Sequence, residues 1–186
     1  MKYFKLTIDM SRKHDVIGHC DNDDIQQNDF IIAKKCMKWE NHFQFFYDKS
    51  EGYIRTDSLA NDKGWLVVSE RLKRLLERMN TEIQFLPVEV VDRDSNVKYR
   101  YYIANILRLV DALCLEHSDY FETEILGLGT IYTVSKFAIY ENRTQNSDIF
   151  KLMNRQEVPV FVSEKFKNII VDNRMTGMSF TEIRVV

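Results

Sequence analysis

Four histidines and three cysteines are the side chains in this 186-residue chain best suited to bind a metal or to act in nucleophilic catalysis. Cys114 and His117 have the two-residue spacing typical of zinc ligands, but no second pair with matching spacing is present. A structural zinc site normally needs four ligands. A Cys–His nucleophile pair also needs an orienting Asn or Asp, and no local signature marks one. We therefore predict no zinc site and interpret the cysteines as reduced thiols.

One acidic segment resembles a calcium-binding loop. Asp21-Asn-Asp-Asp24 supplies closely spaced oxygen ligands. Ile25 and Gln26 then replace a ligand and the obligatory glycine, and Ile32 replaces the bidentate glutamate. The segment is better explained as a solvated acidic loop, and we predict no metal ion there.

Cofactor motifs are equally incomplete. Gly127-Leu-Gly129 lacks the third glycine of a dinucleotide-binding loop, because Tyr132 occupies that position. The sequence also contains neither a P-loop nor a nucleophile elbow. We expect no cofactor and no catalytic residue. One alternative that stays open is a small enzyme or nucleotide-binding module that uses Tyr102, Asn105, Asp111 or His117, and another is RNA binding through basic helices.

Acidic residues are concentrated in two segments, although the formal net charge is only −2. Between positions 111 and 148 seven acidic residues face two basic ones: Asp111, Glu116, Asp119, Glu122, Glu124, Glu141 and Asp148 against Lys136 and Arg143. Residues 15–29 add five carboxylates, and aromatic side chains flank the first segment: Tyr120, Phe121, Tyr132 and Tyr140. Carboxylates steer a basic protein, and aromatic side chains anchor it. We interpret Glu116–Glu124 and residues 15–29 as acidic loops, which are therefore candidate contact surfaces for a basic protein.

The elements that must position these segments are organised around a stretch that occurs twice. Residues 66–76 and residues 160–170 each read as a short apolar strand, Val-Ser-Glu, and a helix with one apolar stripe. Ser69 and Ser163 are predicted N-caps, each followed by a glutamate that suits the positive end of the helix dipole. The opposite helix face is basic through Arg71, Lys73, Arg74, Arg78, Lys165 and Lys167. This face could meet phosphate, but a solvated helix surface explains it better.

Strands are predicted on both sides of each helix, at residues 83–90 and 178–183. The pattern predicts an α+β fold with mixed sheets, a repeated strand-helix-strand unit and a few short helices. We expect one domain, in which residues 1–63 supply N-terminal strands and loops and residues 64–186 contain both repeats. Since the N-terminus lacks an apolar signal region and no apolar run is long enough to span a membrane, we expect a cytoplasmic protein.

An ordered set of motifs resembles a known family. The set comprises Gly64-Trp-Leu-Val-Val-Ser-Glu-Arg-Leu-Lys, Ile83-Gln-Phe-Leu-Pro-Val, Tyr102-Ile-Ala-Asn-Ile-Leu, Val110-Asp-Ala-Leu, Asp148-Ile-Phe-Lys-Leu, Phe161-Val-Ser-Glu-Lys-Phe-Lys and Thr176-Gly-Met-Ser-Phe. In this order the motifs are similar to immunity protein family 11 of bacterial polymorphic toxin systems. The resemblance runs from about Gly64 to Ile183.

The resemblance implies a small cytoplasmic bacterial protein, not an enzyme, that binds a cognate toxin domain and blocks it. Toxins of this kind are often nucleases and therefore basic, so the acidic loops are the expected contact surface. The toxin-binding candidates are Asp21, Asp23, Asp24, Glu116, Asp119, Tyr120, Glu122 and Glu124. The expected partner is the toxin protein, with neither membrane nor nucleic acid involved.

Overall fold

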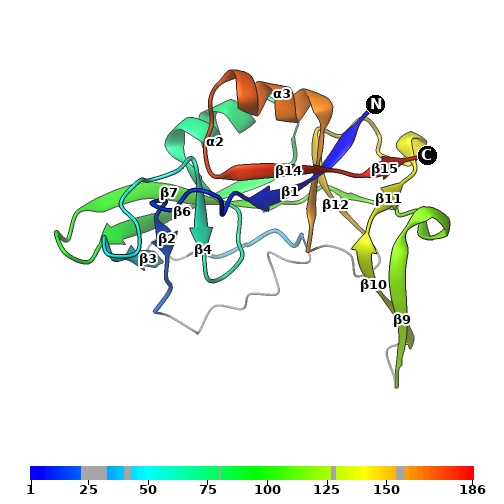
Figure 1. Ribbon diagram of the computed structural model, residues 1–186, viewed down its shortest axis with the longest axis horizontal. Helices are drawn as coiled ribbons and strands as arrows, with labels where there is room; N and C mark the ends of the chain where they lie inside the picture. The colour runs from blue at the N-terminus through cyan, green and yellow to red at the C-terminus, as the bar shows by residue number, and fades with distance from the viewer. Residues whose placement is uncertain (22–32, 40–42, 80, 127–128, 154–157) are drawn as a thin grey trace.

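The computed structural model describes residues 1–21, 33–39, 43–79, 81–126, 129–153 and 158–186, and these residues form mainly β-strands (Figure 1). Two α-helices lie within the described residues, α2 (Glu70–Leu76) and α3 (Glu164–Asp172). Two short 3-10 helices, η1 (Leu115–His117) and η2 (Glu141–Arg143), connect strands. The strands are β1 (Tyr3–Ile8), β2 (Ile17–Gly18), β3 (Gln44–Tyr47), β4 (Ser58–Asn61), β5 (Val67–Ser69), β6 (Ile83–Asp92), β7 (Lys98–Ile106), β8 (Leu109–Val110), β9 (Asp119–Ile125), β10 (Gly129–Lys136), β11 (Ala138–Ile139), β12 (Ile149–Leu152), β13 (Val160–Ser163), β14 (Met178–Glu182) and β15 (Arg184–Val185).

The larger sheet has six strands in the order β2-β4-β5-β7-β6-β3. Its centre is the long antiparallel hairpin of β6 and β7, paired from Ile83 opposite Ile106 to Val91 opposite Lys98. Alternate side chains of these strands enter a core in which Phe43, Phe45 and Trp65 pack ring against ring. Burial of these large aromatic side chains stabilises this face of the sheet.

The second sheet has five strands in the order β14-β1-β13-β12-β8. The N-terminal strand β1 is antiparallel to both neighbours, with Phe4 opposite Val162 and opposite Glu182. The first strand of the chain therefore lies between two strands from its C-terminal end. Two small pairs complete the structure: the antiparallel pair β9–β10 and the parallel pair β11–β15.

Both helices lie side by side over the two sheets (Figure 1). Leu72 and Leu76 of α2 share one hydrophobic core with Phe166 and Ile170 of α3. This core also takes side chains from both large sheets, among them Val68 and Val162. The predicted apolar stripes thus hold the two sheets together under the helices.

The predicted α+β fold of repeated strand-helix-strand units is wrong. Strand dominates the described residues, and the two α-helices among them have seven and nine residues. The strands before and after each helix do not pair with each other: β7 separates β5 from β6, and β1 separates β13 from β14. The repeated pattern identified two local helix starts, whereas non-local antiparallel pairing determined the architecture.

Candidate functional site

The β9–β10 hairpin projects from the body of the molecule (Figure 1). Its strands pair from Ile125 opposite Gly129 to Tyr120 opposite Val134, and the register shifts before Lys136 pairs with Asp119. Successive side chains of a strand point to opposite faces, and cross-strand partners share a face. One face of the hairpin therefore carries Tyr120, Glu122, Glu124, Thr130, Tyr132 and Val134.

The opposite face of the hairpin carries a less charged set of side chains. Phe121 and Thr123 of β9 lie opposite Thr133 and Ile131 of β10. The Phe121 side chain is 72% exposed, and Leu126 beyond the end of β9 is fully exposed. Exposed large apolar side chains on a projecting element are typical of interaction surfaces.

A dense set of contacts fixes the base of the hairpin. The Ser118 hydroxyl donates to the Cys114 carbonyl at 2.6 Å and accepts from the Ala138 amide at 2.9 Å. Phe137, the residue after β10, packs edge-on against Phe161 with ring centroids 5.0 Å apart. The base is therefore part of the folded body, and strands β9 and β10 extend away from it (Figure 1).

Carboxylates of the hairpin differ in how they are paired. Asp119 forms an ion pair with Lys136 at 2.8 Å, and this contact raises the pKa of the Lys136 ammonium. Glu116, Glu122 and Glu124 are exposed and have no ion pair or hydrogen bond through their side chains with any described residue. Glu122 and Glu124 lie on one face of β9 with Cα atoms about 7 Å apart, and their carboxylates form a local negative field.

An aromatic pair stands beside these carboxylates. Tyr120 and Tyr132 meet edge to face with ring centroids 5.4 Å apart, on the face that also bears Glu122 and Glu124. Edge-to-face aromatic pairs contribute about 0.5–1.5 kcal/mol beyond simple burial. The pair therefore links the two strands next to the carboxylates.

The structure brings five of the eight predicted contact residues together: Glu116, Asp119, Tyr120, Glu122 and Glu124 all lie on η1 and β9. Asp21 does not join them, because its carboxylate binds Arg93, at the β6–β7 turn, at 2.8 and 2.9 Å. Asp23 and Asp24 lie outside the described residues.

Interpreting Glu116–Glu124 as a loop was wrong, since residues 119–125 form a strand. The alternation of acidic residues with Tyr, Phe and Thr, followed by glycines at 127 and 129, is a hairpin signal. The same alternation marks Ile131, a residue of this surface that the sequence interpretation did not single out.

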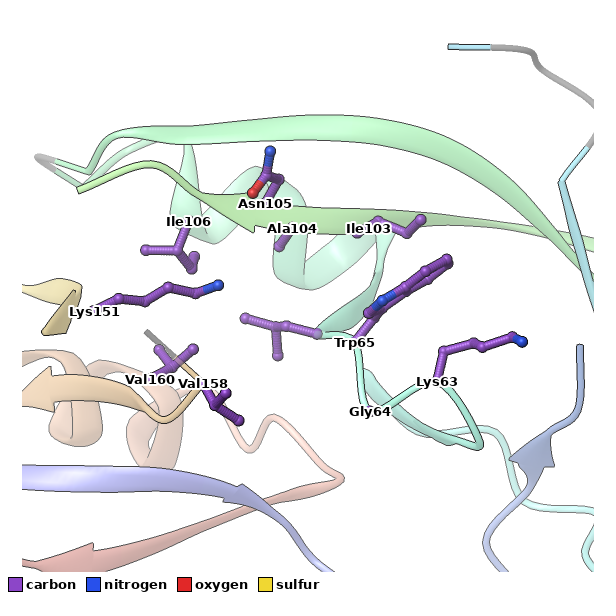
Figure 2. Close-up of a pocket in the computed structure, with 11 residues that line it drawn as sticks. Lys63, Gly64, Trp65, Ile103, Ala104, Asn105, Ile106, Lys151, Val158 and Val160 are labelled. Carbon is purple, nitrogen blue, oxygen red and sulfur yellow. The ribbon is translucent and has the colours of Figure 1, made fainter. Parts of the chain in front are cut away.

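A small pocket of about 160 Å³ lies between β7 and the five-stranded sheet (Figure 2). Trp65, Ile106 and Val160 contribute apolar walls, and Lys63 and Lys151 contribute ammonium groups. An adjoining pocket of about 310 Å³ shares Trp65 and Val160 and extends along β1. Among the described residues that line the two pockets, none has a carboxylate or an imidazole side chain.

The four residues of the alternative enzyme hypothesis do not share one site. Tyr102 and Asn105 point to opposite faces of β7, because their positions differ by an odd number. Asn105 is buried, and its Nδ2 donates to the Lys34 carbonyl at 2.9 Å. Burial and a hydrogen bond to Glu70 raise the pKa of Tyr102, which favours its neutral form. Within the described residues no group of three or more His, Cys, Asp or Glu side chains could hold a metal ion.

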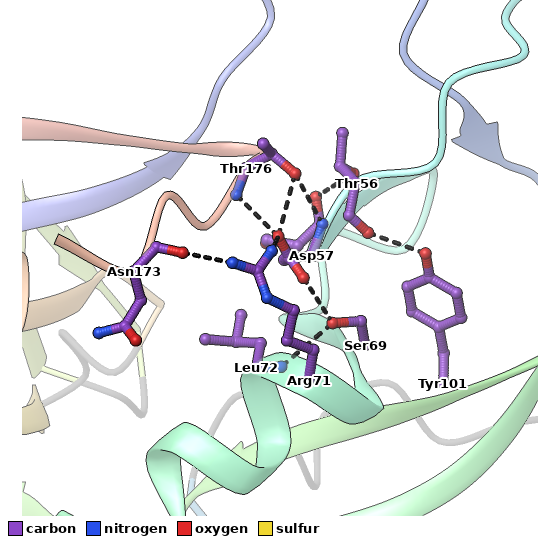
Figure 3. Close-up of polar contacts among 9 residues, drawn as sticks. Thr56, Asp57, Ser69, Arg71, Leu72, Tyr101, Asn173 and Thr176 are labelled. Atoms are coloured by element: carbon purple, nitrogen blue, oxygen red, sulfur yellow. Dashed lines mark hydrogen bonds and ion pairs between the residues drawn. The ribbon is translucent and has the colours of Figure 1, made fainter. Parts of the chain in front are cut away.

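A polar cluster surrounds Asp57 (Figure 3). Its carboxylate accepts hydrogen bonds from the Ser69 hydroxyl at 2.9 Å, from Arg71 Nη1 at 3.1 Å and from the Thr176 amide at 3.0 Å. Arg71 also donates to the Asn173 carbonyl. This cluster joins the start of α2 to the segment between α3 and β14, so its role is structural.

Basic residues of the two helices are largely committed to such contacts. Lys73 pairs with Glu77 at 2.6 Å and Arg74 pairs with Glu70 at 2.9 Å. Lys165 pairs with Asp148 at 2.8 Å, as Arg71 does with Asp57. Phosphate binding through the helices would compete with these ion pairs, which supports the interpretation of a solvated helix surface.

Comparison with known proteins gives one family. The sequence model of the immunity protein family Imm11 matches residues 2–185, which is nearly the whole chain and extends beyond the region of the predicted resemblance. No curated protein matches the chain. The described helices are too short to cross a membrane.

Proposed function

Because this chain belongs to the immunity protein family Imm11, we propose that it binds a cognate bacterial toxin domain and neutralises it by occlusion. The β9–β10 hairpin is the principal contact surface in this proposal. The observation that carries it is a projecting hairpin that combines the exposed Phe121 with two carboxylates, Glu122 and Glu124, that have no ion pair with any described residue.

The exposed part of this hairpin contributes little to the folding of the chain. Two-stranded hairpins are marginally stable by themselves, and this one leaves Phe121, Glu122 and Glu124 exposed. A surface that contributes so little to the core is available for a partner. Burial of Phe121 and Leu126 by that partner would supply the apolar part of the binding energy.

Electrostatics indicate the chemistry of the partner. Glu122 and Glu124 favour a toxin with a basic surface, such as that of a nuclease, where they would take the place of nucleic-acid phosphates. Complementary charge accelerates association and suppresses wrong partners. Inhibition then needs no catalytic step by this chain: the bound hairpin covers the toxin's cleft in the cytoplasm of the producing cell.

Co-expression with the product of the reading frame immediately upstream tests the proposal. We expect the two proteins to elute as one complex and the cells to survive a toxin that otherwise stops growth. In the double variant Glu122→Lys/Glu124→Lys, binding should weaken by roughly 2 kcal/mol or more, about 30-fold in Kd, and protection should fail.

A matched control is the double variant Asp94→Lys/Asp172→Lys, which makes the same change in net charge at two exposed positions outside the hairpin. Its affinity and protection should equal those of the unmodified chain. If the hairpin variant keeps full affinity, the hairpin is not the contact surface. If neither toxicity nor a complex is observed, the immunity function itself is contradicted for this partner.

A further inference from the structure

The free edge of β9 points to a specific mode of binding. Resting on the function proposed above, we propose that the toxin adds a β-strand to this edge, and that the added strand alternates basic and apolar side chains. Strand addition to an exposed sheet edge is a recurrent mode of protein recognition.

Backbone pairing is the first argument. Among the described residues, every strand pairing of β9 is with β10, and the pair forms a sheet of its own. In Figure 1 β9 is the outer strand of the hairpin. Half of its backbone N–H and C=O groups therefore face away from β10, and an edge with unpaired groups is a template for another strand.

Composition of this edge is the second argument. Edge strands that must stay unpaired usually carry lysine or proline, and β9 contains neither. Its charges are Asp119, Glu122 and Glu124, all of one sign. Pairing of β9 with β9 of a second copy would place rows of carboxylates next to each other, which is unfavourable. Charge repulsion therefore disfavours pairing of β9 with β9 of a second copy, whereas a strand of opposite charge can pair with it.

The alternation of side chains along β9 predicts the residue types of the added strand. An added strand places every second side chain beside Glu122 and Glu124, and the intervening side chains beside Phe121 and Thr123. Arginine or lysine at positions i and i+2 fits the first face. Aliphatic or aromatic side chains fit the second face, where the 72% exposed Phe121 would lose contact with water.

Amide-resolved hydrogen exchange in the complex with the upstream product tests strand addition. We expect alternate amides of residues 119–125, those that face away from β10, to exchange at least tenfold more slowly in the complex. The outward amides of β10 should keep their rates. In the free protein the exchange rates of β9 should not depend on protein concentration.

A composition-preserving variant adds a second measurement. Exchanging two neighbours as Glu122→Thr/Thr123→Glu leaves net charge and composition unchanged but moves one carboxylate to the opposite face. Affinity should fall at least tenfold, because the basic side chain of the added strand loses its partner.

Each other result has a defined meaning. A stable complex in which the β9 amides are not protected overturns strand addition and leaves the immunity function standing. Protection of β9 in the free protein that grows with concentration assigns the edge to a second copy and also overturns the proposal. Failure to form any complex contradicts both the immunity function and the strand addition that rests on it.

Discussion

Two antiparallel hairpins of similar length differ in how many other strands they pair with and in how deeply their side chains are buried. β6–β7 lies in the middle of the larger sheet, where β6 also pairs with β3 and β7 also pairs with β5. The β9–β10 hairpin pairs only with itself among the described residues. Val88, Val90 and Ile103 of the first hairpin are buried, whereas Phe121 and Glu122 of the second are exposed.

The buried β6–β7 hairpin contributes to stability, whereas the exposed β9–β10 hairpin is available for binding. Burial of aliphatic side chains on β6 and β7 contributes to the free energy of unfolding of the whole chain. Side chains of β9 and β10 beyond the base of the hairpin contribute little to this free energy of unfolding. Their residue types can therefore suit contact with a partner without a loss of stability. Substitutions in the first hairpin should change stability, and substitutions in the second should change binding.

The largest expected effect comes from a matched pair of isoleucines. Ile103→Ala removes a side chain that is 1% exposed in β7 and should lower the free energy of unfolding by about 2–5 kcal/mol. Ile131→Ala in β10, where the side chain is only half-buried, should cost less than about 1 kcal/mol. Urea titration of both variants measures the difference. Equal losses would show that the second hairpin is as integral to the core as the first.

A smaller effect is expected at the β6–β7 turn. The Asp92 carboxylate accepts hydrogen bonds from Ser95 Oγ at 2.6 Å and from the Asp94 amide at 3.0 Å, and it pairs with Lys49 at 2.7 Å. These contacts, above all the one with Lys49, hold the pKa of Asp92 well below its usual value of 3.8. The ionised group therefore stabilises the fold above about pH 4, and this stabilisation is lost as the pH falls through the lowered pKa.

Thermal melts of Asp92→Asn test this dependence on pH. The variant should melt below the unmodified chain at pH 7, and the gap should narrow as the pH falls below about 4. Asp94→Asn, at an exposed carboxylate of the same turn, is the control and should show no such gap. A gap that is constant from pH 7 to pH 3 would contradict the role of the charge.

The smallest effect on stability is expected at Phe121. Phe121→Ser should change the free energy of unfolding by no more than about 0.5 kcal/mol, because the side chain is 72% exposed. Affinity for the toxin should nevertheless fall about tenfold or more, since exposed aromatic side chains at interfaces often dominate binding. Calorimetric titration measures this loss. Val171→Ser in α3, at another exposed apolar side chain, should leave the affinity unchanged.

Local interactions made the helix starts predictable from the sequence. Ser69 and Ser163 are N-caps whose hydroxyls accept from the amides of Leu72 and Phe166, each at 3.1 Å, as predicted. Leu72 and Leu76 are buried, as the apolar stripe of α2 predicted. N-capping and helical periodicity depend on residues within one or two turns, so a short stretch of sequence contains the information.

Sequence alone also determined the family resemblance and the clustering of acidic residues next to aromatic ones. Only the tertiary structure decided that β7 lies between β5 and β6, that Asp57 bonds to Thr176 far along the chain, and that β10 is the one partner of β9 among the described strands. Strand pairing joins residues that are distant in sequence, and its energy depends on which neighbours and which burial each strand finds. A strand with alternating polar and apolar residues has the same sequence pattern in the middle of a sheet and at its edge. Only the tertiary structure therefore shows that β6–β7 lies in the core and that β9–β10 is exposed.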